Sequence, residues 1–397
     1  MKRTFTLIFI TITLLTLLFT SCNADASAGL FRQLADAKEP VGIRYKQIIG
    51  KDATHLYFLA NDGIYKTNGS TTTTVKKNES NKLILETSLV NTTITYLLNN
   101  DNADIFSIQT DGTLDTPIAP TSSDLKVGFV VKRLLGNNVF LLQGNNTMDD
   151  SKSFEVTAYD VTTGNFTKKT LQALPSTSYG LVEVMQLSGR THWELGTFNA
   201  TTEKAPIILS FTDGKPKDAT YVHYYVDGTN LYTITAPNER LAGFSMITNG
   251  AKNYLYILTI SGDLYGCEVI AGDMTPTIMK KSSKSYKENA FMYTVSDGST
   301  THIITKPQTP NTAFWVFSFD NELIDQTKPV SMTEVKEGYA KHMSNVNIVS
   351  SYEIAINKLL VATFENGMFS ITIDPIAANS NFNSGTSSAS EAYQISW

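Results

Sequence analysis

Cysteine is scarce in this sequence: Cys22 and Cys267 are the two cysteines of a 397-residue chain. Two cysteines exclude a small disulfide-stapled domain and a zinc or iron–sulfur protein held by several thiolates. Charged residues make up 17% of the chain, and the formal net charge is −5. Ordinary soluble domains contain about 25% charged residues. A nucleic-acid-binding protein needs a surplus of Lys and Arg, so this balance argues against one.

Long amphipathic helical patterns are absent after residue 40, where no segment repeats apolar residues with a 3.6-residue period. Short alternating or aromatic-rich runs take their place, separated by Asn, Asp and Gly. Hydrophobic residues make up 42% of the chain, which is enough for a folded core and excludes general disorder. The pattern predicts an all-β protein.

The N-terminus has the form of an export signal. Met1–Arg3 supplies two positive charges, and Thr4–Thr20 follows with no charge and many Leu, Ile and Phe residues. A membrane-spanning helix needs about 20 apolar residues, and this run is shorter and contains several threonines. We therefore interpret residues 1–21 as a cleaved signal peptide.

The segment Leu18–Cys22 resembles the lipobox of bacterial lipoproteins, in which a cysteine follows the cleavage site directly. Thr20 and Ser21 fit the small residues of that motif, whereas Phe19 stands where the family has a branched aliphatic residue. The resemblance implies that Cys22 becomes the first residue and carries acyl chains. These chains would tether the protein to a membrane, at about 0.8 kcal/mol per buried CH₂.

A second interpretation of this region stays open. Ala24–Ala26 and Ala26–Ala28 both fit ordinary signal-peptidase sites, and cleavage there would release a protein without Cys22. Cleavage before Cys22 instead removes Lys2 and Arg3 and leaves a net charge of −7. The acyl chains would then supply the membrane attachment, because the net charge gives no attraction to anionic lipid.

A strand–turn–strand unit recurs seven times in the body of the chain. The copies begin near residues 55, 94, 139, 191, 254, 302 and 358, at intervals of 39 to 63 residues. The clearest copies are His55–Tyr65, with an Asn-Asp-Gly turn, and Tyr254–Val269, with a Ser-Gly-Asp turn. Such turns tolerate positive φ at low cost. Additional strands before and after each hairpin, such as Tyr45–Ile49 and Thr167–Leu171, would give four strands per unit.

Four antiparallel strands repeated every 40–50 residues predict a β-propeller. We expect about seven blades. An eighth stays open, because Tyr221–Ile234 forms an extra hairpin in the longest interval. The alternatives are several β-sandwiches or a β-helix, but no linkers are visible between residues 45 and 375.

One blade carries a family resemblance. Asp160–Gly164 fits the Asp-x-x-Thr-Gly turn of quinoprotein-like bacterial propellers. The resemblance implies a divergent propeller and, as a remote third option, a quinone-dependent enzyme. The tryptophans that dock those repeats are largely missing, since the blades contain only Trp193 and Trp315.

Candidate catalytic and metal-binding residues are few. His55, His192 and His302 begin three of the repeats, so a three-histidine metal site is conceivable, but none has His-x-x-x-His spacing. We therefore predict no catalytic residue, no metal and no cofactor. Lys280–Lys287 is the one basic run, which we expect to be a solvated loop between two repeats. Cys267 is expected to be a buried free thiol.

The expected organisation is a signal peptide at 1–21, a tether at 22–40 and a propeller at 41–376. A flexible linker at 377–390 and a C-terminal strand at 391–397 that closes the ring follow. The function expected is that of a bacterial cell-envelope lipoprotein that binds a protein or a glycan through its propeller loops. The outer membrane, periplasm and cell surface all stay open as its location. The alternative is an exported carbohydrate-active enzyme with two carboxylates facing each other across the channel.

Overall fold

The computed structural model contains strands, turns and loops, and all residues described below belong to one compact unit, Arg44–Trp397. The structure describes residues 44–80, 82–98, 105–118, 129–135, 138–143, 154–160, 165–171, 180–186, 207–213, 219–227, 230–249, 251–272, 274–282, 284–286, 290–296, 299–307, 312–320, 329–335, 347–355, 358–364 and 367–372. The segments predicted as signal peptide (1–21), tether (22–40), linker (377–390) and C-terminal strand (391–397), with Cys22, lie outside these ranges. No helix of these ranges has the length and apolar character needed to cross a membrane.

The described strands form seven sheets, each built from strands that follow one another in the chain. The first three sheets comprise β1 (Tyr45–Lys51), β2 (Leu56–Ala60), β3 (Gly63–Thr67), β4 (Thr72–Lys77); β5 (Ile84–Val90), β6 (Thr93–Leu98), β7 (Ile105–Gln109), β8 (Thr116–Ile118); and β9 (Phe129–Leu135), β10 (Asn138–Gln143), β11 (Phe154–Asp160), β12 (Asn165–Leu171).

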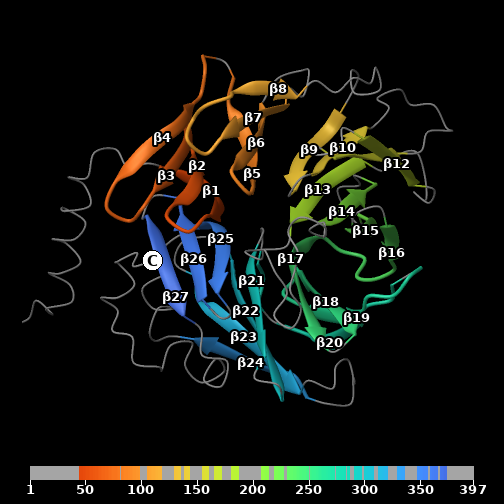
Figure 1. Ribbon diagram of the computed structural model, residues 1–397. Coiled ribbons are helices and arrows are strands. Elements are labelled where there is room, and N and C mark those ends of the chain that lie inside the picture. Colours follow the sequence, from red (N-terminus) through yellow and green to blue (C-terminus); the bar gives the residue numbers. More distant parts are fainter. Residues whose placement is uncertain are drawn as a thin grey trace, which may run out of the picture. The chain divides into compact units, whose positions relative to one another are not determined.

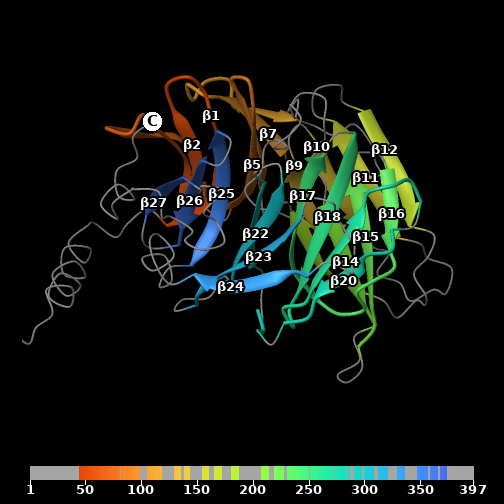
Figure 2. The same ribbon diagram turned by 90° about the horizontal axis from the view of Figure 1, so that it is seen from below.

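The other four sheets comprise β13 (Gly180–Gln186), β14 (Ile207–Thr212), β15 (Tyr221–Asp227), β16 (Asn230–Ile234); β17 (Leu241–Asn249), β18 (Lys252–Thr259), β19 (Leu264–Glu268), β20 (Thr277–Lys280); β21 (Ala290–Ser296), β22 (Thr300–Pro307), β23 (Phe314–Asp320), β24 (Ser331–Val335); and β25 (Ile348–Ala355), β26 (Lys358–Thr363), β27 (Met368–Thr372). Figures 1 and 2 show these sheets as separate groups of adjacent strands.

Every sheet is an antiparallel meander, which local turn chemistry explains. Gly262 and Gly367 adopt φ values of +92° and +91° in turns that join the second and third strands of their sheets. Glycine reaches this region without the steric penalty that a Cβ atom imposes. The apolar strands on either side then pair over short sequence distances, as Leu258 does with Leu264.

The first strand of each sheet lies next to the first strands of neighbouring sheets. Such contacts join β1 to β5, β5 to β9, β13 to β17, and β17 to β21 (Figure 1). β1 also contacts β25 and β26 of the last sheet, so the first and last sheets of the described unit are neighbours. The described residues therefore form a β-propeller with seven blades. The first strand of each blade lies on the inner side, towards the axis.

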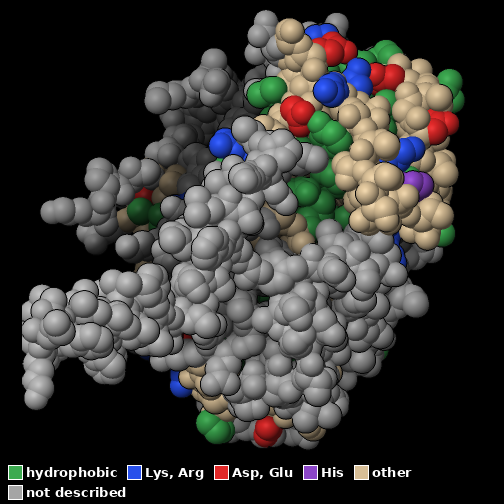
Figure 3. Space-filling view, turned by 90° about the vertical axis from the view of Figure 1, so that its left-hand side faces the viewer, with side chains coloured by type: hydrophobic (Ala, Val, Ile, Leu, Met, Phe, Trp, Pro, Cys, Tyr) green, Lys and Arg blue, Asp and Glu red, His purple; other side chains and the backbone are tan. Residues whose placement is uncertain are grey.

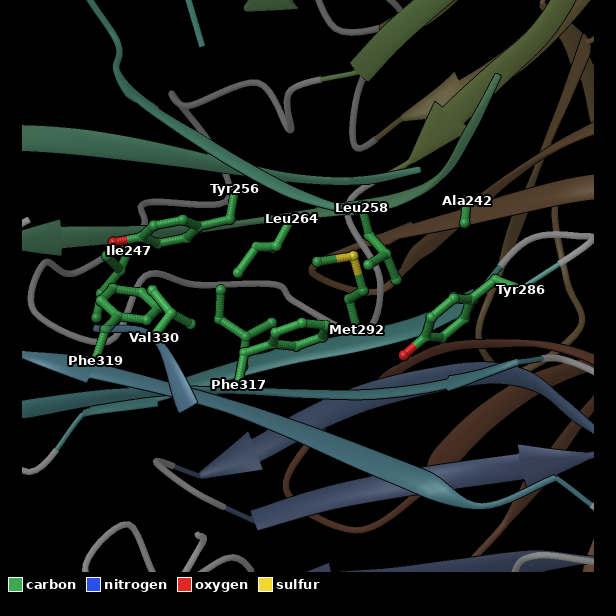
Figure 4. Packing of buried hydrophobic residues seen from close by; sticks show 12 residues of the cluster. Ala242, Ile247, Tyr256, Leu258, Leu264, Tyr286, Met292, Phe317, Phe319 and Val330 are labelled. Carbon is green, nitrogen blue, oxygen red and sulfur yellow. The ribbon is translucent and has the colours of Figure 1, made fainter. Parts of the chain in front are cut away.

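Apolar side chains fill the space between blades. Figure 4 shows one such cluster between the fifth and sixth sheets, in which Tyr256, Leu258 and Leu264 face Met292 and Phe317. Each of these side chains is fully buried. A second cluster joins the sixth and seventh sheets and contains Tyr293, Ile304, Leu359 and Val361. A single sheet exposes an apolar face, and stacking against its neighbours buries it.

The structure confirms the predicted class and resolves one open alternative. The hairpin Tyr221–Ile234 provides the third and fourth strands of the fourth sheet, so it is neither an insertion nor an eighth blade. The seventh sheet has three strands, β25 to β27, among the described residues.

Candidate functional site

The inner strands of adjacent blades are joined by polar side chains. The Gln47 side chain of β1 donates from Nε2 to the Thr87 carbonyl of β5 (2.9 Å), and its Oε1 accepts from the Thr87 backbone N–H and hydroxyl (both 3.0 Å). The Ile48 N–H of β1 donates to Ser350 Oγ of β25 at 3.0 Å. Thr87 is 1% exposed, so these groups are satisfied by protein atoms rather than by solvent.

Two further pairs repeat this arrangement around the axis. The Ser245 and Thr294 hydroxyls, on β17 and β21, lie 2.6 Å apart. The Tyr293 hydroxyl of β21 donates to Glu353 Oε1 of β25 at 2.6 Å. These hydroxyl, amide and carboxylate groups hold neighbouring blades together. Groups that already satisfy one another in this way have little capacity left for a ligand.

In the part that the structure describes, the inner strands are where the alternative of a carbohydrate-active enzyme would place its two carboxylates. Glu353 is the one buried carboxylate there, at 2% exposure, and it bonds to Tyr293. A glycoside hydrolase normally needs two carboxyl groups about 5–10 Å apart. Glu86 of β5 is half-buried.

A β-bulge recurs near the beginning of the first strand in six of the seven sheets. Each bulge places one extra residue opposite the second strand, and these residues are Lys46, Leu85, Val130, Val182, Ala242 and Val349. Bulges redirect side chains and are common next to functional sites. Leu85, the extra residue of the second sheet, keeps 41% of its surface exposed, whereas Ala242, its equivalent in the fifth sheet, is 1% exposed.

Around the first, second and seventh sheets, apolar and cationic side chains gather where the first strands begin. We call this end of the sheets the entrance end, and we call Arg44, Lys46, Leu83, Leu85 and Phe364 the entrance rim. Leu83 is 46% exposed, Leu85 41% and Phe364 40%. The Arg44 guanidinium lies 5.5 Å from the centre of the Phe364 ring, in a cation–π contact.

Hydrogen bonds fix the backbone beneath the entrance rim. The Asn61 N–H donates to the Arg44 carbonyl at 3.0 Å, and the Asn78 N–H donates to the Asp62 carbonyl at 2.9 Å. The Asn78 side chain donates to the Asn61 carbonyl, and its Oδ1 accepts from the Ile84 N–H. The rim residues of the first two sheets therefore share a connected support.

The opposite end of the sheets presents two other exposed apolar residues, Leu114 and Ile270. Both lie in turns between third and fourth strands, and their exposed fractions are 70% and 52%. Leu114 adopts a φ of +53°, which is uncommon for a residue with a bulky side chain. Its turn is held by hydrogen bonds between Gln109 and Thr113 and between Thr113 and Asp111.

The structure describes two of the three histidines considered as metal ligands and not predicted to bind a metal. His55 is part-exposed, and its Nδ1 lies 2.8 Å from the Thr54 hydroxyl. His302 is 3% exposed, and its Nδ1 lies 2.7 Å from Ser318 Oγ. His192 lies outside the described residues. Within those residues, no group of three His, Cys, Asp or Glu side chains is arranged to hold a metal ion.

Sequence reasoning missed the environment of His223. This residue is fully buried, with Nδ1 2.8 Å from Ser210 Oγ and Nε2 3.0 Å from the Glu239 carbonyl. A carbonyl only accepts hydrogen bonds, so Nε2 carries the proton and Nδ1 accepts from the serine. Burial lowers the pKa of His223 to about 4 and outweighs the hydrogen bonds to the backbone, which raise it.

The basic run is more ordered than a solvated loop. Lys280 ends β20, Tyr286 is 1% exposed, and Lys284 Nζ lies 4.9 Å from the centre of the Trp315 ring. The Tyr286 N–H donates to the Ile260 carbonyl at 2.8 Å. Lys281 and Lys284 are exposed, so the expectation of solvated charges holds for these side chains while the backbone packs against the fifth sheet.

Cys267 is buried in an apolar cluster of the fourth and fifth sheets, as predicted. Burial raises the pKa of its thiol to about 12, which removes the reactive thiolate at neutral pH.

Figure 3 shows one side of the molecule. On its described part, Lys or Arg side chains lie beside Asp or Glu side chains around hydrophobic ones. Lys76, for example, pairs with Glu79 at 3.2 Å and Asp115 at 2.7 Å.

Comparison with known proteins finds similarity at the level of structure. No protein-family model and no curated protein sequence matches this chain. The chain is similar to PorZ, a bacterial surface component of the type-IX secretion system of Porphyromonas gingivalis (10% identity, TM-score 0.40). That match covers 84% of this chain but only 37% of PorZ.

Two other solved structures are similar over most of their length. YCF48 from Cyanidioschyzon merolae is 12% identical with a TM-score of 0.47, and the match covers 84% of this chain and 97% of that one. Drosophila Semaphorin 1b is 7% identical with a TM-score of 0.44, over 83% and 85% of the two chains. At these identities the likeness concerns the fold.

Proposed function

We propose that this chain is an exported lipoprotein of the bacterial cell envelope, acylated at Cys22, whose β-propeller is a binding or scaffold module. The lipobox-like segment Leu18–Cys22 supports the anchor. Acyl chains on the first residue would hold the propeller near a membrane through a tether of about 20 residues. The propeller then needs a partner-binding surface rather than catalytic groups.

The observation that carries the binding role is the exposure of large aliphatic side chains on ordered turns. Leu114 is the strongest case, because it combines 70% exposure with a positive φ. Exposing a leucine and holding its backbone in a disfavoured region both cost free energy in the isolated chain. A partner that covers the side chain would offset that cost.

A protein fits these turns better than a glycan does. Leu114 and Ile270 offer aliphatic surface of the kind that packs into an apolar pocket on another protein. Two of the inner-strand groups that a sugar would need, the Gln47 amide and the Thr87 hydroxyl, are already bonded to each other. We therefore assign the opposite end, with its two exposed turns, to a protein partner.

Site-specific photocrosslinking in the native envelope tests this role. A photoreactive residue at position 114 or 270 should give one discrete adduct with another protein. The matched control is position 73, which is exposed on the outer strand β4 and should give none. Adducts of equal yield from all three positions, or no adduct from 114 and 270, would remove the protein-binding role.

The three-stranded seventh sheet supports a second proposal, for the tail 391–397. Tyr393, Ile395 and Trp397 alternate with Ala392, Gln394 and Ser396, which is the period-two pattern of a half-buried strand. We propose that this tail adds the fourth strand beside β27. A chain that stops at residue 390 should unfold at lower denaturant concentration, and a synthetic peptide of the tail should restore the midpoint. Equal midpoints with and without the tail would contradict the proposal.

A further inference from the structure

We propose that the entrance rim rests on the surface of an anionic lipid bilayer. The propeller would then be oriented with the opposite end, which carries Leu114 and Ile270, directed away from the lipid. This inference rests on the proposed acyl anchor at Cys22, and it adds an orientation that a flexible tether alone does not provide.

Chain connectivity joins the segment that follows Cys22 to the entrance end. Arg44 is the first described residue and leads into β1, so the segment that follows Cys22 joins the propeller at the entrance end. The 22 residues from Cys22 to Ile43 span at most about 70–80 Å when fully extended. The tether is therefore long enough for this end to reach the bilayer. Whether it binds there depends on the side chains of the entrance rim.

The composition of the rim suits a lipid–water interface. Leu83, Leu85 and Phe364 are three of the five exposed large apolar side chains in the described part of the chain. Arg44 and Lys46 are exposed beside them. Peripheral membrane surfaces combine apolar side chains that enter the headgroup region with cations that attract anionic lipid.

Local charge differs from the net charge at this end. Of the nearby acidic residues, Glu79 pairs with Lys76 and Lys82. Asp62 is exposed and accepts a hydrogen bond from the Tyr65 hydroxyl at 2.6 Å, which does not offset a carboxylate charge, so it is one acidic group against Arg44, Lys46 and Lys77. Lys46 and Lys77 are exposed on the same end of the first sheet. The net negative charge of the whole chain therefore does not describe the surface that faces the tether.

Rigid support keeps the cost of docking low. Lys46 and Leu85 are the extra residues of equivalent bulges in adjacent blades, and the hydrogen-bonded turns at Asn61 and Asn78 hold the strands together. Little backbone has to become ordered on contact, so more of the apolar and electrostatic attraction appears as binding. The outward position of these two side chains also lets them be replaced without disturbing the strand ladder.

A fluorescent label that senses its surroundings tests the orientation. The acylated chain would carry an environment-sensitive dye on Leu85→Cys or, as the matched control, on Ile270→Cys. Cys267 stays unlabelled because it is buried. The proteins are placed on vesicles of phosphatidylcholine with and without phosphatidylglycerol. We expect a blue-shifted emission and protection from aqueous iodide at position 85 on the anionic vesicles, and neither change at 270.

Charge reversal provides the second arm. Lys46→Glu should abolish most of the shift at position 85, whereas Lys51→Glu, an exposed lysine at the other end of the same strand, should leave it unchanged. High salt should act like Lys46→Glu because it screens surface charges. Equal emission from positions 85 and 270, or equal effects of the two lysine variants, would overturn the proposal.

The experiment separates this inference from the anchor on which it rests. Intact mass reports acylation directly, before any vesicle is added. An acylated chain whose rim label stays in water would leave the anchor standing and reject the docking. In the native envelope, a photoreactive residue at position 85 that crosslinks to a protein would assign the rim to a protein and reject the docking as well.

Discussion

The Gln47 side chain forms three hydrogen bonds with Thr87 across the boundary between the first two blades, two with its backbone and one with its hydroxyl, 40 residues apart in the chain. An amide side chain thereby takes the place that a neighbouring strand would have in a continuous sheet. Inner strands of separate blades do not share a backbone ladder, so their polar groups need partners from side chains. The same requirement explains the contacts of Ser350 and Thr294.

Gln47→Ala should destabilise the protein by about 1–3 kcal/mol, because it leaves the buried N–H and C=O of Thr87 without their side-chain partner. The loss should appear as a lower midpoint of urea unfolding. Gln109→Ala is the matched control, since that amide makes one hydrogen bond, to the Thr93 hydroxyl, in a part-exposed site. Equal losses from the two variants would contradict the role given to Gln47.

Acid should destabilise the fold through His223. Its pKa of about 4 in the folded protein is depressed from the ordinary 6.5, so the unfolded chain binds more protons between these values. The stabilisation is therefore complete above pH 6.5 and is lost as the pH falls towards 4. His223→Gln should flatten this dependence by an amount on the order of 3 kcal/mol. Parallel pH profiles for the two proteins would count against this account.

Gly262 should be the least replaceable of the turn glycines. A Cβ atom there would lie 1.8 Å from the Lys284 carbonyl oxygen, whereas a Cβ at Gly272 would meet nothing within 4 Å. Both have positive φ, at +92° and +104°. Gly272→Ala should therefore lower the free energy of unfolding only by the cost of placing an alanine at positive φ, about 1–2 kcal/mol. We expect Gly262→Ala to cost more and to increase hydrogen exchange at Tyr286. Similar unfolding midpoints for both variants would show that the Lys284 segment moves aside easily.

Thiol reactivity tests the burial of Cys267, and the number of thiols in the unfolded protein tests the acylation of Cys22. Cys267 is buried with a pKa of about 12, so the folded protein should not react with a thiol reagent at neutral pH. After unfolding, the protein isolated from membranes should show one thiol, because acylation consumes the Cys22 sulfur. Two thiols in the unfolded protein would mean that Cys22 is retained without its thioether, and fast reaction of the folded protein would contradict the buried site.

Much of the architecture was predictable because the strands are local. The hairpins at Asn61–Gly63 and Ser261–Asp263 carry both the apolar strands and the turn residues that join them, so sequence reasoning found them. First strands such as β5 and β21 were missed because neither shows a clear alternation of apolar and polar residues. A bulge interrupts the alternation in β5, and β21 is apolar on both faces. The third and fourth strands of the fourth sheet were recognised as a hairpin but not placed, because no local signal states which sheet a hairpin joins.

The candidate surfaces were less predictable than the fold. The entrance rim unites Arg44 and Phe364, which lie 320 residues apart in the chain and meet only because the first and last sheets pack together. The exposure of Leu114 depends on a positive backbone φ, and a leucine in the sequence gives no indication of that conformation. The inter-blade bonds of Gln47 and Glu353 likewise depend on the axial stagger of separate sheets, which composition and periodicity do not encode.

Intact mass spectrometry of the mature protein, purified from the membranes of its host, tests the central claim most directly. The account predicts a chain that begins at Cys22 and carries the added mass of a diacylglycerol thioether and an amide-linked acyl chain. A mature protein that begins with a free amine at Ser27 or Gly29 would contradict the anchored propeller and the bilayer-facing rim that depends on it.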